Sequence, residues 1–480
     1  MKNNVLIKGI CLIVAAVAIS VTVSAEIDIT SRFLKNYSFD NHFDHKSGET
    51  TTVSQELNSV RGWTSDLSAN YTILGVYEYG FKGRINGTAM PTSGYEESTG
   101  GALAVSTGWG QTFYLYQEVT LPAGEYTISV PIYNMRTVVG GTSGLAWIPG
   151  TGTAVTSELT SYPSKVWTLD CINVKLTKQT KGKIQIGYKA ASGSSTNSAI
   201  LLIDNIKITT TKMTISVASK RTITTRAKSL YGDGTGNGAE ELKAVWDATQ
   251  ATFNNTEASD EDVITAYYNL VDACELYRQR NASEESPIDQ TSYIVNPSFE
   301  TNGTSGWEIH NLSLQSNSVF TKKDGTYYAE TWVNIGDHIG EASASQTVYD
   351  LPRGYYKLTA AALHIQQSGS GSISNKGEPQ TGAFLFAGNT KETVTSMKQY
   401  ELKFAVVEDE EDVEIGLKTE NPTGNYLCVD NFTLQYIGMV TSEVIAEEVL
   451  HLVSEAEEYL AKGVQNPVAE TLSAAISAAQ

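Results

Sequence analysis

The sequence predicts a mainly β protein with two antiparallel β-sandwich domains and interspersed α-helical hairpins. Three observations support this fold class. Short apolar or alternating runs, such as "YTISVPIYN" and "KGKIQIGYKA", follow one another between clusters of Gly, Pro, Asn and Ser, as antiparallel strands do. A set of sequence landmarks occurs twice in the same order. Helix-spaced apolar stripes follow each occurrence.

The N-terminus has the pattern of a secretory signal peptide over residues 1–25. Lys2 and Lys8 precede an apolar run over residues 10–23, and the Val-Ser-Ala at 23–25 fits a small-residue cleavage site. The run is short for a membrane span, and an uncleaved anchor is the alternative. No later segment is long and apolar enough to cross a membrane. We therefore expect a secreted, periplasmic or cell-surface protein with no transmembrane segment after the signal peptide.

The net charge of the chain limits the classes of molecule that it can bind. Without residues 1–25 the chain has 32 basic and 53 acidic residues, a net charge of −21. This charge repels phosphate backbones, so nucleic acid is excluded as a partner, whereas a neutral glycan is not repelled. Cys171, Cys274 and Cys428 lie far apart in apolar runs. We expect them to be small buried hydrophobes rather than zinc ligands.

The repeated landmarks define two domains, residues 26–212 and 286–438. Each begins with an Asn-x-Ser-Phe-acid motif, at Asn36 and at Asn296, followed by a Gly-Trp pair. Each continues with a strand, a Pro-x-Gly turn and a second strand with Tyr two residues past the Gly. Each ends in a strand that contains Asp-Asn, at Asp204 and at Asp430. Four landmarks in one order indicate a duplicated sandwich.

These motifs resemble carbohydrate-binding modules with a galactose-binding-like jelly roll. The resemblance covers most of the second copy and, more loosely, the first, where Tyr37 replaces the Pro and Asp40 replaces the Glu. It implies two jelly-roll domains that hold a polysaccharide or host glycan. This fold also serves protein adhesion and spacing, so the motifs specify the fold better than the ligand.

The resemblance also implies a structural Ca²⁺ site at one edge of each sandwich. It pairs Glu300 with Asp430 and Asp40 with Asp204, and carboxylate oxygens are ligands that Ca²⁺ prefers. The alternative is that these acids accept hydrogen bonds from turn amides. General acid or base chemistry by Glu300 is less favoured, because no partner carboxylate is implied nearby.

Sugar binding requires aromatic faces, on which the C–H surfaces of a pyranose stack. Trp63 and Trp307 follow the opening motif and are expected in the cores. Candidates for a glycan platform lie beside loops, although each such residue is more often a rim or core residue than one that stacks on a sugar: Trp109, Trp147, Tyr327, Tyr328, Trp332 and His338. They do not match between the copies, so the two domains are expected to bind different glycans, or only one is expected to bind.

Helical spacers follow each sandwich. Residues 213–285 are expected to contain a linker, with the Gly-rich Tyr231–Gly238, and a helical hairpin from Ala239 to about Arg280. Ser259 and Asp262 predict a capping box for its second helix. Residues 439–480 predict a second spacer, whose last helix ends without a cap. We therefore expect a truncated chain, the N-terminal part of a longer protein.

The predicted function is non-catalytic glycan binding by substrate-targeting modules of a secreted, modular bacterial protein. A glycoside hydrolase or polysaccharide lyase domain is expected downstream. The alternative is a surface adhesin or structural stalk that binds proteins, and an enzyme within these residues ranks third, because no catalytic signature occurs. Aromatic residues gathered on one sandwich face would favour glycan, a broad apolar patch would favour protein, and acids converging in a cleft would favour an enzyme.

Overall fold

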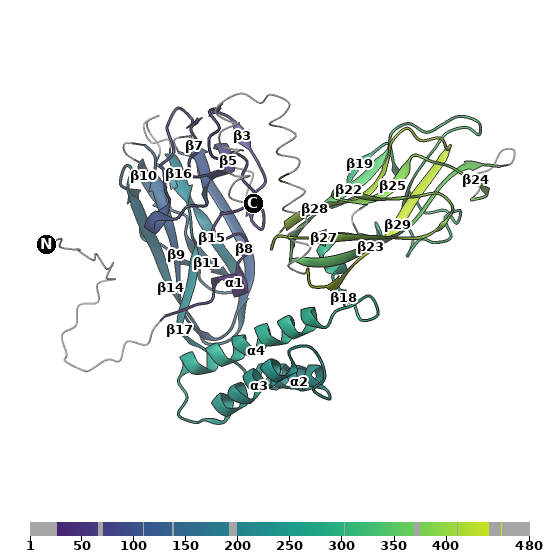
Figure 1. Ribbon diagram of the computed structural model, residues 1–480. Coiled ribbons are helices and arrows are strands. Elements are labelled where there is room, and N and C mark those ends of the chain that lie inside the picture. Colours follow the sequence, from purple (N-terminus) through teal and green to yellow (C-terminus); the bar gives the residue numbers. More distant parts are fainter. Residues whose placement is uncertain are drawn as a thin grey trace, which may run out of the picture. The chain divides into compact units, whose positions relative to one another are not determined.

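The computed structural model describes residues 26–440 and residue 453, with gaps at 66–70, 109, 137–138, 192–198, 302, 369–374 and 410. The chain divides into two compact units. Unit 1 contains residues up to Thr224 together with Asp247–Asn269, and unit 2 contains Thr225–Trp246 and the residues from Leu270 onward. Each unit contains one β-sandwich (Figure 1). The predicted fold class is confirmed.

The first sandwich, in unit 1, is built on an eight-stranded sheet, here called sheet A. Its strand order is β1 (Ile27–Asp28), β17 (Lys207–Met213), β9 (Gly124–Asn134), β16 (Ala199–Ile203), β7 (Gly101–Thr107), β5 (Tyr71–Glu78) and β3 (Glu56–Leu57), with β14 (Trp167–Leu176) also paired to β9. Unit 1 also contains two short helical turns, α1 (Thr30–Phe33) and η1 (Tyr95–Glu97). A separate two-stranded parallel sheet pairs β2 (Thr52–Val53) with β6 (Arg84–Ile85).

Sheet C is the second layer of the first sandwich. It has seven strands: β12 (Val155–Thr156), β11 (Ala146–Pro149), β15 (Thr180–Ala190), β10 (Val139–Ser143) and β13 (Ser161–Tyr162) in order, and β8 (Thr112–Leu121), which pairs with β15 and with β4 (Thr64–Ser65). The long β8–β15 pair is antiparallel. Alternate residues of β8, such as Phe113 and Leu115, face the core between the sheets.

The second sandwich, in unit 2, has the same two-layer design. Sheet E contains β20 (Ser313–Gln315), β21 (Tyr328–Trp332), β29 (Tyr426–Gly438), β23 (Gly354–Gln367) and β24 (Gly377–Pro379), with β18 (Ile288–Asp289) on β29 and β27 (Lys398–Val406) on β23. Sheet F contains β19 (Glu308–His310), β22 (Ser343–Leu351), β28 (Glu411–Thr419), β25 (Ala383–Ala387) and β26 (Thr390–Thr393). A 3₁₀ turn, η3 (Thr291–Tyr293), follows β18.

The opening motif makes the same contacts in both sandwiches. The indole Nε1 of Trp63 donates a hydrogen bond to the carbonyl of Asn36 at 3.1 Å, and Trp307 donates to Asn296 at 3.0 Å. Both asparagines have a positive φ, 45° and 53°, a conformation that Asn tolerates better than most residues. Both tryptophans are buried, so their predicted core positions are confirmed.

The central motif is also built alike in the two sandwiches. Tyr126 donates from its hydroxyl to the carbonyl of Pro122 at 2.9 Å, and Tyr356 donates to that of Pro352 at 2.7 Å. This bond ties the Tyr of the second strand to the Pro that begins the turn. It gives a physical reason for the Pro-x-Gly-x-Tyr spacing in the sequence.

Three helices, rather than a two-helix hairpin, follow the first sandwich: α2 (Val217–Tyr231), α3 (Ala239–Asn254) and α4 (Asp260–Arg280). The sequence predicts α3 and α4 and misses α2, in which the described burial is limited to Ile223 and Ala227. Such a thin apolar stripe gives little periodic signal. The predicted capping box is present, because Asp262 N donates to Ser259 Oγ and Ser259 N donates to Asp262 Oδ2, each at 3.1 Å.

The first half of α4 packs into the core of the first sandwich (Figure 1). Ile264 is fully buried there, and Tyr268 packs beside it under the guanidinium of Arg32, whose Cζ lies 4.7 Å from the ring centroid. The first half of α4 therefore belongs to the same compact unit as the first sandwich.

Two predicted segments, the signal peptide at 1–25 and nearly all of the second spacer at 439–480, lie outside the described residues. Within the described ranges, no helix is both long and apolar enough to cross a membrane.

We expect Ile264→Ala to loosen the first sandwich as well as α4. Loss of a buried Ile side chain costs about 2–4 kcal/mol. Hydrogen–deuterium exchange should therefore rise in the peptide that covers β17. Leu276→Ala, at a half-exposed position on the same helix, is the control and should leave β17 protected. Unchanged exchange in β17 of the Ile264→Ala protein would contradict this packing.

Candidate functional site

Two of the predicted platform residues are buried, which corrects the prediction. Trp147 is 1% exposed and lies on β11, where it pairs with Ile184 and packs over Gly182; a Cβ there would lie 2.7 Å from its ring. Tyr328 is also buried, and its hydroxyl donates to Glu330 at 2.9 Å. A buried ring offers no face to a sugar.

Three other predicted platform residues are exposed but lie apart along the chain. Tyr327 is 42% exposed and Trp332 is 50% exposed, and His338 is exposed as well. Tyr327 precedes β21 and Trp332 ends it, so five residues of extended chain, roughly 16 Å, separate the two rings. They do not form one platform. Trp109, the remaining candidate, lies outside the described residues.

An aromatic surface that the sequence did not single out lies on the outer side of sheet C. Phe113 and Leu115 of β8 face the core, so Tyr114 and Tyr116 face outward, side by side. Both are half-buried. We call the outward residues of β8 and β15 the β8 face: Tyr114, Tyr116, Glu118, Lys183 and Gln185. The period-two pattern of "TFYLYQEV" is the signal that could have located it.

Glycine makes room for the first ring of the β8 face. A Cβ at Gly187 or at Gly144 would lie 2.7 Å from atoms of the Tyr114 ring. The ring therefore lies over space that side chains at these positions would fill. Burial against the sheet raises the pKa of Tyr114, so its phenol stays protonated at neutral pH and remains able to donate a hydrogen bond.

Polar groups surround the second ring. Lys183 Nζ lies 3.8 Å from the centroid of Tyr116, a cation–π contact. Glu118 pairs with Lys181 at 2.9 Å, and Gln185 Nε2 donates to the carbonyl of Gly144 at 2.9 Å. The β8 face thus combines aromatic rings with a cation, an acid and an amide, the groups that fix sugar hydroxyls.

The predicted acid pair of the second sandwich surrounds one loop, residues 324–327. Asp430 is 0% exposed, and its Oδ2 accepts from the amide of Asp324 at 2.7 Å. Glu300 Oε1 accepts from the amides of Thr326 at 2.7 Å and Tyr327 at 2.5 Å. Glu300 therefore holds a turn, as the alternative interpretation of this residue expected.

Burial raises the pKa of Asp430 to about 7, and the negative charges of Asp324 and Glu300 add to this shift. Its Oδ1 is buried and has no hydrogen-bond partner among the described residues. An oxygen in that state is costly unless a proton or a cation satisfies it.

The first sandwich repeats this arrangement. Asp204 is fully buried, and its Oδ2 accepts from Tyr79 and Ser98 hydroxyls at 3.0 and 2.9 Å and from the Tyr95 amide at 3.2 Å. Its Oδ1 has no partner among the described residues. Burial raises the pKa of Asp204 to about 6, with a contribution from the charge of Asp40, which itself accepts from the amide of Gly101.

The unpartnered Oδ1 atoms of Asp204 and Asp430 could each supply one ligand to a cation, but not a complete set of ligands. In the described ranges, no group of three or more His, Cys, Asp or Glu side chains is suited to hold a metal. A Ca²⁺ ion at either pair would therefore draw its remaining ligands from main-chain carbonyls and water, which this ion accepts.

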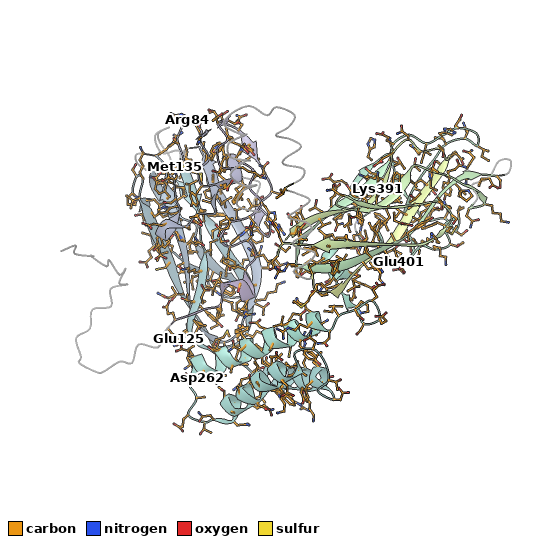
Figure 2. All side chains as sticks on the ribbon, in the orientation of Figure 1. Arg84, Glu125, Met135, Asp262, Lys391 and Glu401 are labelled. Carbon is orange, nitrogen blue, oxygen red and sulfur yellow. The ribbon has the colours of Figure 1, made fainter. Side chains whose placement is uncertain are left out.

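A hollow of about 320 Å³ lies beside β9, β14 and β17 of sheet A. Its rim includes Glu125, labelled in Figure 2, which pairs with Lys175 at 2.6 Å. Tyr126 is its aromatic lining residue and is buried in the core. No open ring face therefore favours a sugar in this hollow.

No protein-family model matches the chain, and no curated protein sequence does. Among solved structures, the module TmCBM61 in complex with beta-1,4-galactotriose is 18% identical, with 30% of this chain and 96% of that chain covered and a TM-score of 0.23. The CBM22-1-CBM22-2 tandem domain of Paenibacillus barcinonensis Xyn10C is 9% identical, with 82% and 100% covered and a TM-score of 0.24. The Stig cyclase Fisc from Fischerella sp. TAU is 17% identical, with 32% and 100% covered and a TM-score of 0.25. Since these proteins differ in function, the likeness selects no ligand.

We expect Asp430 to make stability depend on pH. The pKa is raised from 3.8 unfolded to about 7 folded, so the folded state binds the proton more tightly. Stability therefore falls as the pH rises from about 4 to 7, by roughly 4 kcal/mol at most. In metal-free buffer, the difference in melting temperature between wild type and Asp430→Asn should change across this range. The exposed Asp337→Asn is the control, and a constant difference for Asp430→Asn would refute the assignment.

Proposed function

We propose that this chain binds glycans without catalysis, and that the β8 face of the first sandwich is a binding surface. The observation that carries the proposal is the pair of outward rings, Tyr114 and Tyr116, on one strand beside Lys183 and Gln185. The motifs that resemble carbohydrate-binding modules support the same function.

The chemistry of the β8 face fits a pyranose chain. The C–H faces of sugar rings pack on aromatic rings, and the hydroxyls accept from Lys and donate to Glu. Outward residues two apart on a strand are separated by about 6.6 Å, so a ligand of several sugar units can contact both tyrosines. The net charge of −19 favours a neutral polysaccharide or host glycan over an anionic one.

In this proposal the protein is secreted through the N-terminal signal pattern, and its sandwiches hold a glycoside hydrolase or polysaccharide lyase near its substrate. Two weak sites on one chain raise the effective concentration of ligand at each site. Linked sites can therefore exceed either single affinity by orders of magnitude.

We also propose a structural Ca²⁺ at the acid pairs. The unpartnered Oδ1 atoms of Asp430 and Asp204 support it, because a cation would compensate the cost of burying these carboxylates. Asp430 and Asp204 would supply buried oxygens, and Glu300 and Asp40 would add charge. The ion would supply no chemistry beyond neutralising these acids and fixing the loops they hold.

Removal of either tyrosine should weaken glycan binding. We expect Tyr116→Ala and Tyr114→Ala to lose about tenfold in affinity for any polysaccharide that a glycan array identifies with the full chain. Tyr116→Phe should retain binding, because the ring face carries the contact. Tyr349→Ala, an exposed tyrosine of the other sandwich, is the matched control.

Normal binding by a well-folded Tyr114→Ala/Tyr116→Ala double variant would rule out the β8 face. If binding is lost in Trp332→Ala instead, the site belongs to the second sandwich.

The calcium proposal predicts a metal-dependent stability. The melting temperature of the wild type should be higher in millimolar Ca²⁺ than in chelator, by an amount set by the affinity. Asp430→Asn should reduce this difference, and Asp337→Asn should not. Equal melting temperatures of the wild type in Ca²⁺ and in chelator would leave the acids with a turn-holding role alone.

A further inference from the structure

A hollow of about 220 Å³ opens on the outer face of sheet F in the second sandwich. It lies over β19, β22, β25 and β28. Its lining residues are His310, Glu341, Ala342, Ser343, Ser345, Phe386, Glu414, Lys418 and Thr419. The motif resemblance did not point to any of them.

The hollow lies on the part of the second sandwich that corresponds to the β8 face of the first sandwich. Gln117 of β8 brackets the main chain of Lys35 with two hydrogen bonds, and Gln346 of β22 brackets Val295 in the same way. Each Gln also pairs with an Ile of the neighbouring strand, Ile184 or Ile415. These contacts fix the register between the two sandwiches.

In this register, Tyr116 and Tyr114 correspond to Ser345 and Ser343. Tyr116 faces Gln185 across the strands, whereas Ser345 faces Gly416. The second sandwich therefore has two hydroxymethyl groups and a glycine where the first has two rings and an amide. The small side chains at Ser343, Ser345 and Gly416 leave room for the hollow.

The wall of the hollow is mainly polar, because the phenyl ring of Phe386 is 4% exposed and lies under Lys418. Lys418 Nζ lies 4.8 Å from the ring centroid of Phe386. On the neighbouring β26, Lys391 (Figure 2) covers Phe384 in the same way at 4.5 Å. Ser343 is half-buried and Ser345 is 7% exposed, and both line the hollow.

The charged residues that line the hollow favour neutral ligands over anionic ones. Glu341 and Glu414 line the hollow with one ammonium, Lys418, which also lies 3.5 Å from Glu420. His310 also lines the hollow, and its Nε2 lies 3.1 Å from Asn311 Nδ2. The two carboxylates repel anionic ligands and can accept hydrogen bonds from the hydroxyls of a neutral ligand. The ammonium of Lys418 can donate a hydrogen bond to such hydroxyls.

We propose that this hollow binds a single neutral pyranose, such as the terminal residue of a glycan. It rests on the proposed glycan-binding function and adds a second site of different shape. Pockets for drug-sized ligands usually enclose about 300–1,000 Å³, so a hollow of about 220 Å³ suits one ring rather than a chain. The first sandwich then contacts the length of a glycan and the second contacts its end.

The test uses the full chain and a panel of methyl glycosides: galactoside, glucoside, mannoside, N-acetylglucosaminide and, as the anionic member, glucuronide. Calorimetry or saturation-transfer NMR should detect a neutral member, with a Kd on the order of millimolar or tighter. Ser345→Tyr, which places in the hollow the residue found at position 116, should weaken this binding at least about tenfold. Ser345→Ala keeps the space and loses only one hydroxyl, so it should weaken binding less than Ser345→Tyr does.

Lys418→Met gives a second variant that removes the ammonium and preserves the bulk of the side chain. It should also weaken binding, while circular dichroism and melting temperature verify the fold. The Tyr114→Ala/Tyr116→Ala variant should bind the glycoside as the wild type does, so failure of the β8 face and failure of the hollow are told apart.

Four results would overturn the proposal: no neutral glycoside binds at about 10 mM, Ser345→Tyr binds normally, the glucuronide binds best, or mass spectrometry finds an incubated oligosaccharide cleaved. The last would make Glu341 and Glu414 candidates for catalysis.

Discussion

Each sandwich depends on a clasp between its opening segment and its closing strand. In the second sandwich, the Phe299 ring packs 5.2 Å from Trp307, which packs 4.5 Å from Phe432 of the closing strand. Phe432 N donates to the carbonyl of Pro297 at 3.0 Å. Closing a loop of this length costs entropy that grows only slowly with length, so a compact set of aromatic and main-chain contacts can offset it. The clasp also brings the segments that carry Glu300 and Asp430 together, although they lie far apart in the sequence.

The parts of the fold that the sequence predicted well are those with local causes. The Pro-x-Gly-x-Tyr motif is visible because Tyr126 and Tyr356 bond four residues back, and the opening Asn is visible because few residues adopt its positive φ. The platform residues were harder, since exposure depends on strand pairing across the chain. Gly and Pro around Trp147 suggested a loop, but pairing of β11 with β15 turns that ring inward. Tyr114 and Tyr116 were missed because the alternation that exposes them looks the same on a buried strand.

The outward residues of sheets C and F illustrate how one fold can present different surfaces. Their inward neighbours are constrained by the core, and Gln117 and Gln346 hold the strands in one register. Outward positions do not share that constraint, so Tyr116 and Ser345 can differ in volume without disturbing either core. Surfaces with different side chains follow from the same backbone, which is why the fold alone does not identify the ligand.

The buried acids connect this framework to the loops. Asp204 accepts from the amide of Tyr95, and Glu300 accepts from the amide of Tyr327, so in each sandwich an acid of the pair fixes a loop that carries a tyrosine. Burial raises the pKa of Asp204 to about 6 and of Asp430 to about 7, so both titrate near neutral pH. Their main-chain hydrogen bonds are strongest when the carboxylates are charged, whereas burial favours the neutral form. A proton removes the cost of burial but weakens these bonds, whereas the proposed Ca²⁺ would offset the buried charge and keep them. If the proposed ion binds, it acts on the tyrosine loops through the acids that hold them.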